Sequence, residues 1–294
     1  MSTIRLACLT SLALLGFAGN SLLCRVALKQ TAIDPASFTT IRFLAGASTL
    51  SFILILRRGK PRGGGNWVSA FSLFVYGAGF SFAYKNLPAS SGALILFSSV
   101  QATMIFFGLW NGERFRWRQI GGLLMAFFGV VVLFLPKLTA PPAFGSLLMC
   151  IAGLAWGVYS IRGKGAGDPL SITTGNFLRA APLALGLGLL TYRSVAFDRW
   201  GVIYAVASGA VASGVGYAIW YAALPHLKAT TAAVVQLAVP VLTALGGILF
   251  LKEHLSIHLA LATVAILGGI AIFIFDKRKR FDATPAGNTK PIRH

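Results

Sequence analysis

Acidic residues are scarce in this chain: its 294 residues hold 7 Asp and Glu against 26 Lys and Arg. All seven carboxylates fall at the edges of long apolar segments or between them, so we expect no buried acid in mid-segment that relays protons. The three cysteines, Cys8, Cys24 and Cys150, have neither paired nor metal-ligand spacing, which argues against a metal site and favours small buried residues. No catalytic triad, phosphate loop or dinucleotide fingerprint is present, so we expect no enzyme, no cofactor and no direct use of ATP.

Long uncharged segments dominate what remains. The chain is 56% hydrophobic and 11% charged, and a helix needs about 20 apolar residues to cross a bilayer core about 30 Å thick. No alternating pattern typical of barrel strands appears. We therefore expect an all-α integral membrane protein with ten transmembrane helices. The predicted spans are 6–28, 36–56, 67–84, 89–110, 117–135, 142–161, 169–192, 201–224, 229–251 and 255–275.

The first half of the sequence is repeated in the second half. The segment Pro35–Ala47 aligns with Pro169–Ala181, and Glu113 aligns with Glu253, each just after a long apolar segment. Such duplication is typical of membrane transporters built from two homologous halves. The sequence therefore predicts two five-helix repeats, 1–140 and 141–276, followed by a basic polar tail at 277–294.

The net charge of +19 would suggest a nucleic-acid partner in a soluble protein, but its distribution argues against one. Most Lys and Arg residues fall in alternate loops and in the tail, the bias that marks the cytoplasmic side of a membrane protein. We expect both termini in the cytoplasm and an inner (plasma) membrane location. Because five is an odd number, the two repeats are then inverted, an arrangement that supports alternating access.

Several weak motifs recur in a defined order. They are Pro35 with Arg42 seven residues later, Leu87-Pro88, Glu113, Ala155-Trp156-Gly157, Pro240 and Glu253. Together they resemble the EamA-type branch of the drug/metabolite transporter superfamily over about residues 8–275. The resemblance implies an inner-membrane carrier with a central cavity between its halves. Such carriers are commonly exporters of amino acids or related small metabolites.

Charged residues inside apolar segments are the strongest candidates for a binding site, because placing a charge in hydrocarbon has a high free-energy cost unless the charge faces protein or water. Arg25 lies near a predicted helix end and can extend to the interface. Arg42 lies two turns inside its helix, where it either bonds a neighbouring helix or binds a solute carboxylate or phosphate. Arg179 is predicted to lie nearer mid-membrane, and it too either bonds a neighbouring helix or binds a solute anion. The repeat places neutral Asn176 opposite Arg42.

Uncharged polar and aromatic residues form a second set of candidates. Their side chains either bridge helices or line a wet cavity. The predicted substrate-binding residues are Asn20, Arg42, Gln101, Trp156, Tyr159, Arg179, Tyr217 and Gln236.

Two further features bear on motion. Glu113 and Glu253 either cap a helix or pair with a base, or else act in gating or coupling. Pro240 frees a backbone carbonyl within its predicted helix and is a candidate hinge. With no acid at mid-bilayer, we expect exchange, facilitated transport, or coupling through these two glutamates.

The leading hypothesis is a secondary transporter that exports a small amphipathic metabolite such as an amino acid, with Arg42 or Arg179 facing its carboxylate. Import of a similar solute is the alternative within the same class. A membrane scaffold or lipid-handling protein is the alternative from another class, and it needs no polar residues facing a wet cavity. The expected partners are a small-molecule substrate and the lipid bilayer.

Overall fold

The computed structural model describes residues 1–57, 64–87, 89–134, 142–164, 167–251 and 257–275, and no strand occurs among them. The helices in chain order are α1 (Thr3–Gln30), α2 (Pro35–Leu56), α3 (Trp67–Asn86), α4 (Ala89–Trp110), α5 (Trp117–Phe134), α6 (Ala143–Gly163), α7 (Pro169–Leu190), η2 (Tyr192–Ser194), α8 (Arg199–Ala207), η3 (Ser208–Val215), α9 (Gly216–Ala223), η4 (Leu224–His226), α10 (Ala229–Val235), α11 (Ala238–Leu251) and α12 (Ile257–Phe275).

Many of these helices have the length and composition of membrane spans. Six helical stretches in the described ranges are long and apolar enough to cross a bilayer. Three shorter apolar helices are Ile95–Trp110, Trp117–Val132 and Ala260–Phe275. The predicted all-helical membrane class is confirmed, and the count of ten crossings stays a prediction.

Two predicted spans are not single regular helices. The span 201–224 is continuous, but its middle part, η3, is π-helical between α8 and α9. The span 229–251 is interrupted at Gln236–Leu237 and divides into α10 and α11. The π-helical part ends just before Tyr217, and the interruption of the other span contains Gln236, two residues predicted to bind substrate.

Aspartates begin several helices, which explains their place at the segment edges. Asp34 accepts hydrogen bonds from the N–H groups of Ala36 and Ser37 at 2.9 and 3.0 Å and starts α2. Asp168 bonds Ser171 N at 2.8 Å and starts α7 in the same way. In both cases a proline, which has no N–H to satisfy, follows the cap. The aligned segments of the two halves therefore share a helix start.

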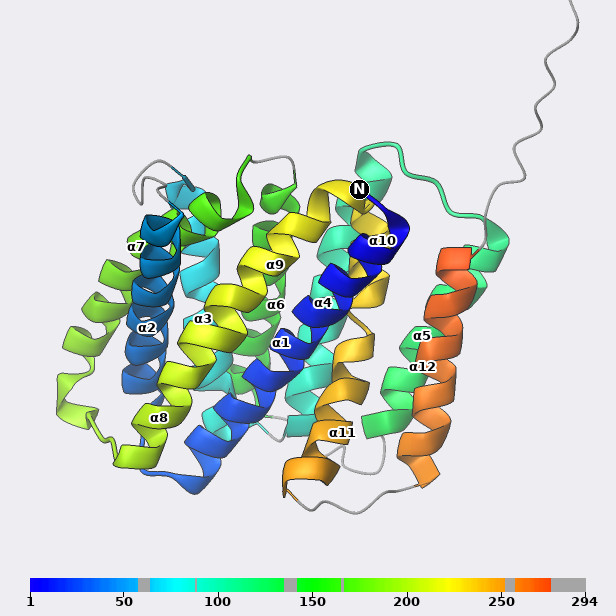
Figure 1. Cartoon of the computed structure of the whole chain (residues 1–294). Helices are drawn as coiled ribbons and strands as arrows, with labels where there is room; N and C mark the ends of the chain where they lie inside the picture. The colour runs from blue at the N-terminus through cyan, green and yellow to red at the C-terminus, as the bar shows by residue number, and fades with distance from the viewer. Residues whose placement is uncertain (58–63, 88, 135–141, 165–166, 252–256, 276–294) are drawn as a thin grey trace, which may run out of the picture.

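Helices at equivalent places in the two halves pack in equivalent ways. α2 packs against α7 at one edge of the molecule, and α5 packs against α12 at the opposite edge (Figure 1). α3 packs on α6, while the continuous run α8–η3–α9 packs on α1. α4 also packs on α6, and α11 on α1. These paired contacts accord with the duplication of the sequence.

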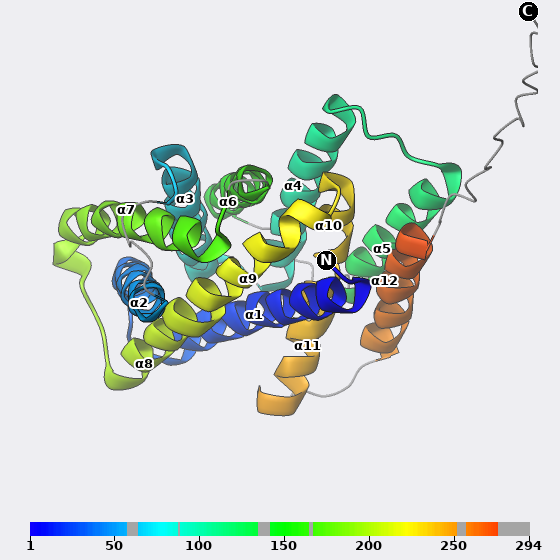
Figure 2. The same ribbon diagram turned by 45° about the horizontal axis from the view of Figure 1, so that its top comes forward.

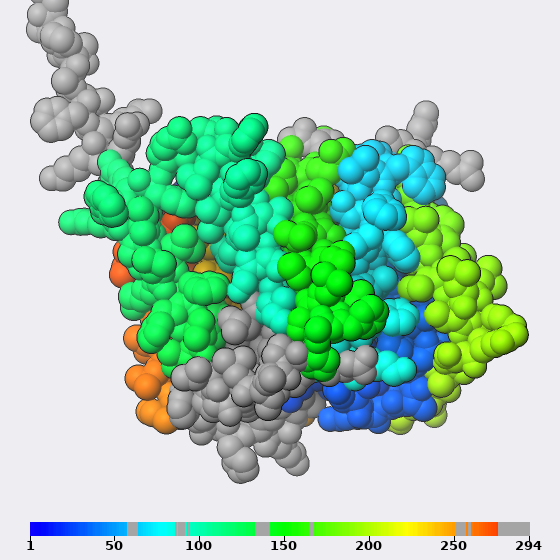
Figure 3. All heavy atoms as spheres, turned by 180° about the vertical axis from the view of Figure 1, so that it is seen from behind, coloured from blue at the N-terminus to red at the C-terminus, as the bar shows by residue number. Residues whose placement is uncertain are grey.

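The remaining views show how these contacts form the body of the molecule. Figure 2 shows α1 passing between the α2–α7 side and the α5–α12 side. Figure 3, from behind, shows the surface of α6 between those of α3 and α4, in agreement with their packing. The start of α1 and the end of α12 lie at the same end of the molecule (Figure 1).

Glycine makes the closest of these helix crossings possible. A methyl group on Gly269 of α12 would lie 2.4 Å from the carbonyl oxygen of Gly122 in α5. A methyl group on Gly209 of η3 would lie 2.1 Å from the carbonyl oxygen of Arg42 in α2. Membrane helices pack through such small residues because lipid supplies no hydrophobic drive between helices. The contact at Gly209 also brings η3 against the backbone that carries Arg42.

Candidate functional site

A guanidinium group is buried where α2 meets η3 and α9. Arg42 is 1% exposed. Its Nε donates to Ser213 Oγ at 3.0 Å, and its Nη2 donates to the hydroxyl of Tyr217 at 2.8 Å. The guanidinium carbon lies 5.6 Å from the centre of the Tyr76 ring, within cation–π range. Nη1 is buried and has no hydrogen-bond partner.

No carboxylate of the described residues pairs with Arg42; its polar contacts are the hydroxyl groups of Ser213 and Tyr217. A buried cation without a counter-ion is unfavourable, and an unsatisfied donor adds to the cost. The site therefore carries a positive charge and one N–H donor group that an anionic ligand would satisfy.

Asn20 of α1 holds the serine that orients Arg42. Its Oδ1 accepts from Ser208 Oγ at 2.7 Å and from Ser213 Oγ at 3.3 Å. Residues five apart in an α-helix point about 140° away from each other. The wider π turn of η3 brings both serines to the same side. The π-helical segment thus lets one amide oxygen bind both hydroxyl groups.

A second polar network surrounds the break between α10 and α11. Trp156 Nε1 donates to Gln236 Oε1 at 2.7 Å, and Gln236 Nε2 donates to the carbonyl of Ala232 at 3.0 Å. Gln101 Nε2 donates to the carbonyl of Ala233 at 2.6 Å, and its Oε1 is buried without a partner. These amides bridge α4, α6 and α10, and Gln101 also offers one unused acceptor.

Aromatic rings fill the space between the two networks. Trp156 lies 4.8 Å from Tyr76 and 4.8 Å from Tyr217, measured between ring centres. Phe17 of α1 meets Trp156 and Trp220 edge-on at 5.1 and 5.5 Å. The same rings contact Arg42 on one side and Gln236 on the other, so the predicted residues Arg42, Trp156, Tyr217 and Gln236 form one connected cluster.

Tyr159 lies at the edge of this aromatic cluster. Its ring stacks on Tyr221 at 4.8 Å and packs 5.6 Å from Trp156. Its backbone carbonyl accepts a hydrogen bond of 2.8 Å from the Tyr221 hydroxyl. Tyr159 therefore joins α6 to α9 rather than contacting Arg42.

Arg179 of α7 contacts backbone carbonyl groups. Its Nη1 donates to the carbonyls of Gly64 and Gly175 at 2.8 and 2.9 Å. The neighbouring Asn176 Oδ1 accepts from Asn66 N at 3.0 Å. Long side chains on a helix point back towards its N-terminus, and Arg179 accordingly reaches the chain segment before α3. Asn176 and Arg179, which lie near the repeat equivalent of Arg42, thus hold the segment before α3, and among the described residues no hydrogen bond joins Arg179 to Arg42.

Pro240 accounts for the break in the predicted ninth span. Proline has no N–H, and its ring clashes with the carbonyl four residues earlier, here that of Gln236. That carbonyl instead accepts from Val239 N at 3.0 Å, while Gln236 N and Leu237 N bond carbonyls three residues back. The interruption therefore falls at Gln236–Leu237, one turn before Pro240.

Glu113 follows α4 and caps α10. Its carboxylate accepts from Ala229 N at 2.9 Å, Thr230 N at 3.1 Å and Thr230 Oγ1 at 2.5 Å. Burial alone would raise the pKa of Glu113, but the hydrogen bonds from Thr230 and Ala229, aided by Lys164, outweigh burial and lower it. The cap joins the two halves of the chain. Its repeat partner Glu253 lies outside the described residues.

Sequence reasoning missed Phe17, Tyr76, Ser208 and Ser213. Each lies in a predicted span, and Tyr76 and the serines are polar residues within apolar helices, the same signal that identified Asn20. Which of the many such hydroxyl groups face Arg42 depends on helix rotation and on the π turn.

The apolar helices, the paired halves and the buried polar cluster define a multi-pass membrane protein of the transporter class. The family model for the EamA-like transporter family matches residues 4–135 and again 143–275. The chain belongs to this family, within the drug/metabolite transporter superfamily.

Relatives of the chain match it over most of its length. The chain is 52% identical to an uncharacterized protein of Pseudomonas aeruginosa, over 90% of this chain and 93% of that protein. It is 24% identical to a "Probable amino-acid metabolite efflux pump" of Escherichia coli, over 84% of this chain and 88% of the other. A solved crystal structure with 24% identity shares the fold, with a TM-score of 0.75 over 90% of this chain and 98% of that one.

Proposed function

We propose that the protein is a secondary transporter of the inner membrane that exports a small metabolite carrying an anionic group, such as an amino acid. Transport proceeds by alternating access between two inverted five-helix halves, 1–140 and 141–276, with both termini cytoplasmic. Membership of the EamA-like transporter family and the paired helix contacts support this proposal.

The observation that carries the proposal is the buried guanidinium of Arg42. It is 1% exposed, has no carboxylate partner among the described residues and has an unsatisfied Nη1. A solute carboxylate or phosphate would supply both the missing charge and the missing acceptor. Intramembrane charges of this kind commonly mark a substrate path.

The rest of the cluster suits a solute with a small apolar body. The rings of Tyr76, Trp156 and Tyr217 lie against one another beside the guanidinium. An aromatic surface next to a cation favours a ligand that is charged at one end and apolar at the other. Amino acids have this character, and the Escherichia coli relative is named for export of amino-acid metabolites.

Two predicted residues act in this scheme through their neighbours. Asn20 fixes Ser213, which in turn accepts from Arg42 Nε, so Asn20 positions the cation. Gln236 holds Trp156 at the break between α10 and α11. Gln101 keeps a buried acceptor, Oε1, for a hydrogen-bond donor of the solute.

The interruption between α10 and α11 is the proposed hinge for the conformational change during transport. α10 has seven residues, is capped at its start by Glu113 and ends at the interruption produced by Pro240. Rotation of α10 about that interruption would displace Gln236 and with it Trp156. Glu113 joins the loop after α4 to the start of α10.

Reconstituted liposomes test the proposal directly. Vesicles loaded with labelled amino acids are compared with vesicles loaded with the matching amides, which lack the carboxylate. We expect counterflow of one or more carboxylate solutes, loss of that flux in Arg42→Ala, and no flux of the amide. Equal transport of acid and amide, or no flux of any solute across a broad panel, would contradict the proposed function. Vesicles with a known protein orientation distinguish export from import.

A further inference from the structure

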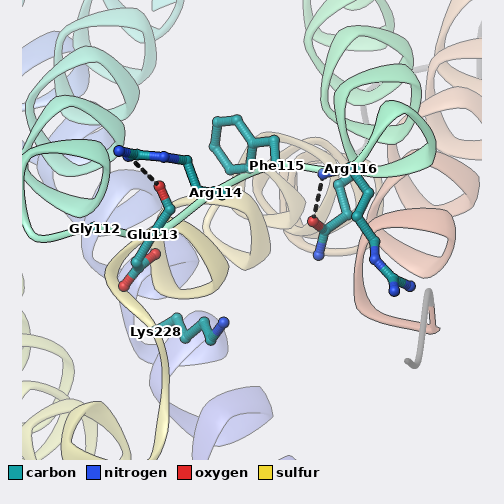
Figure 4. Close-up of a pocket in the computed structure, with 7 residues that line it drawn as sticks. Gly112, Glu113, Arg114, Phe115, Arg116 and Lys228 are labelled. Atoms are coloured by element: carbon teal, nitrogen blue, oxygen red, sulfur yellow. Dashed lines mark hydrogen bonds between the residues drawn. The ribbon is translucent and has the colours of Figure 1, made fainter. Parts of the chain in front are cut away.

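A cavity of about 430 Å³ opens beside the loop between α4 and α5. Its lining residues are Gly112, Glu113, Arg114, Phe115, Arg116, Gln119 and Lys228. Figure 4 shows Lys228 reaching from the start of α10 towards the side of the hollow that carries Arg116. This cavity is separate from the cluster around Arg42, which none of its lining residues joins.

The cavity carries an excess of positive charge. Three lining residues are cationic, and the single acid, Glu113, is already engaged by Ala229 and Thr230. The side chain of Lys228 has no hydrogen-bond or ion-pair partner among the residues that the structure describes, although its backbone carbonyl accepts from Ala232 N at 2.9 Å. Arg114 donates through Nη1 to the carbonyls of Leu109 and Glu113 at 3.2 and 3.3 Å, which fixes its guanidinium at the end of α4.

The surroundings of the cavity resemble a membrane–water interface. Trp110 at the end of α4 and Trp117 at the start of α5 are 80% and 87% exposed. Exposed tryptophans at helix ends are typical of the headgroup region. Further along the same helices, Phe106 and Phe128 are also exposed and suit contact with acyl chains. A polar, basic hollow therefore lies next to a lipid-facing apolar surface.

We propose that this cavity binds the phosphate headgroup of an anionic phospholipid from the cytoplasmic leaflet. Lys228 and Arg114 supply charge to the phosphate, and the acyl chains run along the exposed faces of α4 and α5. Basic pockets between helices on the cytoplasmic side bind such headgroups. The occupied site lies beside Glu113, which caps α10.

Native mass spectrometry of the full-length protein in detergent measures this binding. Phosphatidylglycerol and phosphatidylcholine are titrated into the wild type and into a double variant, Arg114→Gln with Lys228→Gln. The matched control is Arg193→Gln with Arg199→Gln, which removes two exposed charges near the start of α8, far from the cavity. Melting temperatures of both variants check that the fold is retained.

We expect wild type and control to prefer phosphatidylglycerol, and the Arg114/Lys228 variant to bind it about ten- to thirtyfold more weakly. Equal binding of the two lipids, or equal losses in both variants, would mean that these cations only set the topology. Soluble glycerol phosphate is added as a competitor in the same assay. Full displacement of the lipid at matched concentration would identify a free-phosphate site and overturn the lipid assignment. Because lipid binding is measured without transport, the result does not depend on the proposed function.

Discussion

The hydroxyl group of Thr230 donates a hydrogen bond of 2.5 Å to Glu113 Oε2, across 117 positions of sequence. It ties the loop after α4, in the first half of the chain, to the first turn of α10, in the second half. The backbone N–H of Thr230 donates to the same oxygen at 3.1 Å. One carboxylate therefore both starts α10 and joins the two halves.

The lowered pKa of Glu113 predicts a dependence of stability on pH. A carboxyl group whose pKa is lower in the folded than in the unfolded protein stabilises the fold above the unfolded pKa, and this contribution is lost as pH falls through the folded pKa. At pH 7 we expect Glu113→Gln to cost about 1 kcal/mol, the scale of a lost helix cap. Thermal unfolding at pH 7 and near pH 4 measures the difference between the two proteins.

That difference should shrink as the pH falls below the ordinary pKa of a glutamate, because the unfolded wild type then takes up a proton that the folded protein binds less readily. Asp34, whose pKa is lowered as well, is present in both proteins, so its own effect cancels. A difference that stays constant from pH 7 to pH 4 would show that the charge of Glu113 does not contribute to the cap.

Two substitutions of Arg42 distinguish the effect of its positive charge from the effect of its planar guanidinium shape. Lys keeps the charge but loses the planar fork of donors, so Arg42→Lys should weaken binding of an anionic solute. Arg42→Ala should lower affinity about ten- to a hundredfold, the scale of a lost charged hydrogen bond. Solute binding to purified protein gives both values. Unchanged affinity in both variants would assign Arg42 to structure alone.

Arg179 of α7 is the matched contrast to Arg42. It bonds the carbonyls of Gly64 and Gly175, so Arg179→Ala should lower the melting temperature and leave solute affinity near that of the wild type. Arg42→Ala should therefore lower solute affinity more than melting temperature, and Arg179→Ala should lower melting temperature more than solute affinity. An affinity loss in Arg179→Ala as large as that in Arg42→Ala would place Arg179 in the binding site after all.

Pro240→Ala should restore regular helix geometry near Gln236 and slow transport. Because proline disfavours a helix interior, the variant should melt at the same temperature or higher, while its turnover falls several-fold. Pro182, also inside a helix, α7, is the control. Flux assays should show that Pro182→Ala retains its rate. Wild-type turnover in Pro240→Ala would exclude a hinge at this break.

Reporter fusions test the inverted arrangement of the halves. The distribution of Lys and Arg predicts a cytoplasmic signal for fusions after Arg118 and at the C-terminus, and an external signal at Arg199. Phosphatase and fluorescent-protein fusions report the two sides. An external C-terminus would be incompatible with ten crossings that begin in the cytoplasm.

The sequence predicted the helices well because membrane burial depends on composition over long windows. The duplicated Asp-Pro starts at Asp34 and Asp168 follow from local chemistry, and the structure shows both caps. The irregular geometry of the two spans 201–224 and 229–251 was harder to predict from the sequence. Pro240 indicated a hinge, but no sequence signal in the segment 208–215 predicted its π turn.

The sequence by itself determined that this chain consists of apolar membrane helices, because a bilayer enforces helical backbone and apolar surface wherever the chain crosses it. Its internal repeat also determined that the helices form two related halves. The sequence also identified Arg42 and Arg179 as charges that need an explanation. Only the tertiary structure shows their partners: helix rotation turns Arg42 towards Ser213 and Tyr217, with no carboxylate partner among the described residues, and directs Arg179 to the carbonyl of Gly64. Side-chain partners depend on contacts between segments more than 100 residues apart, and composition and periodicity do not encode those contacts.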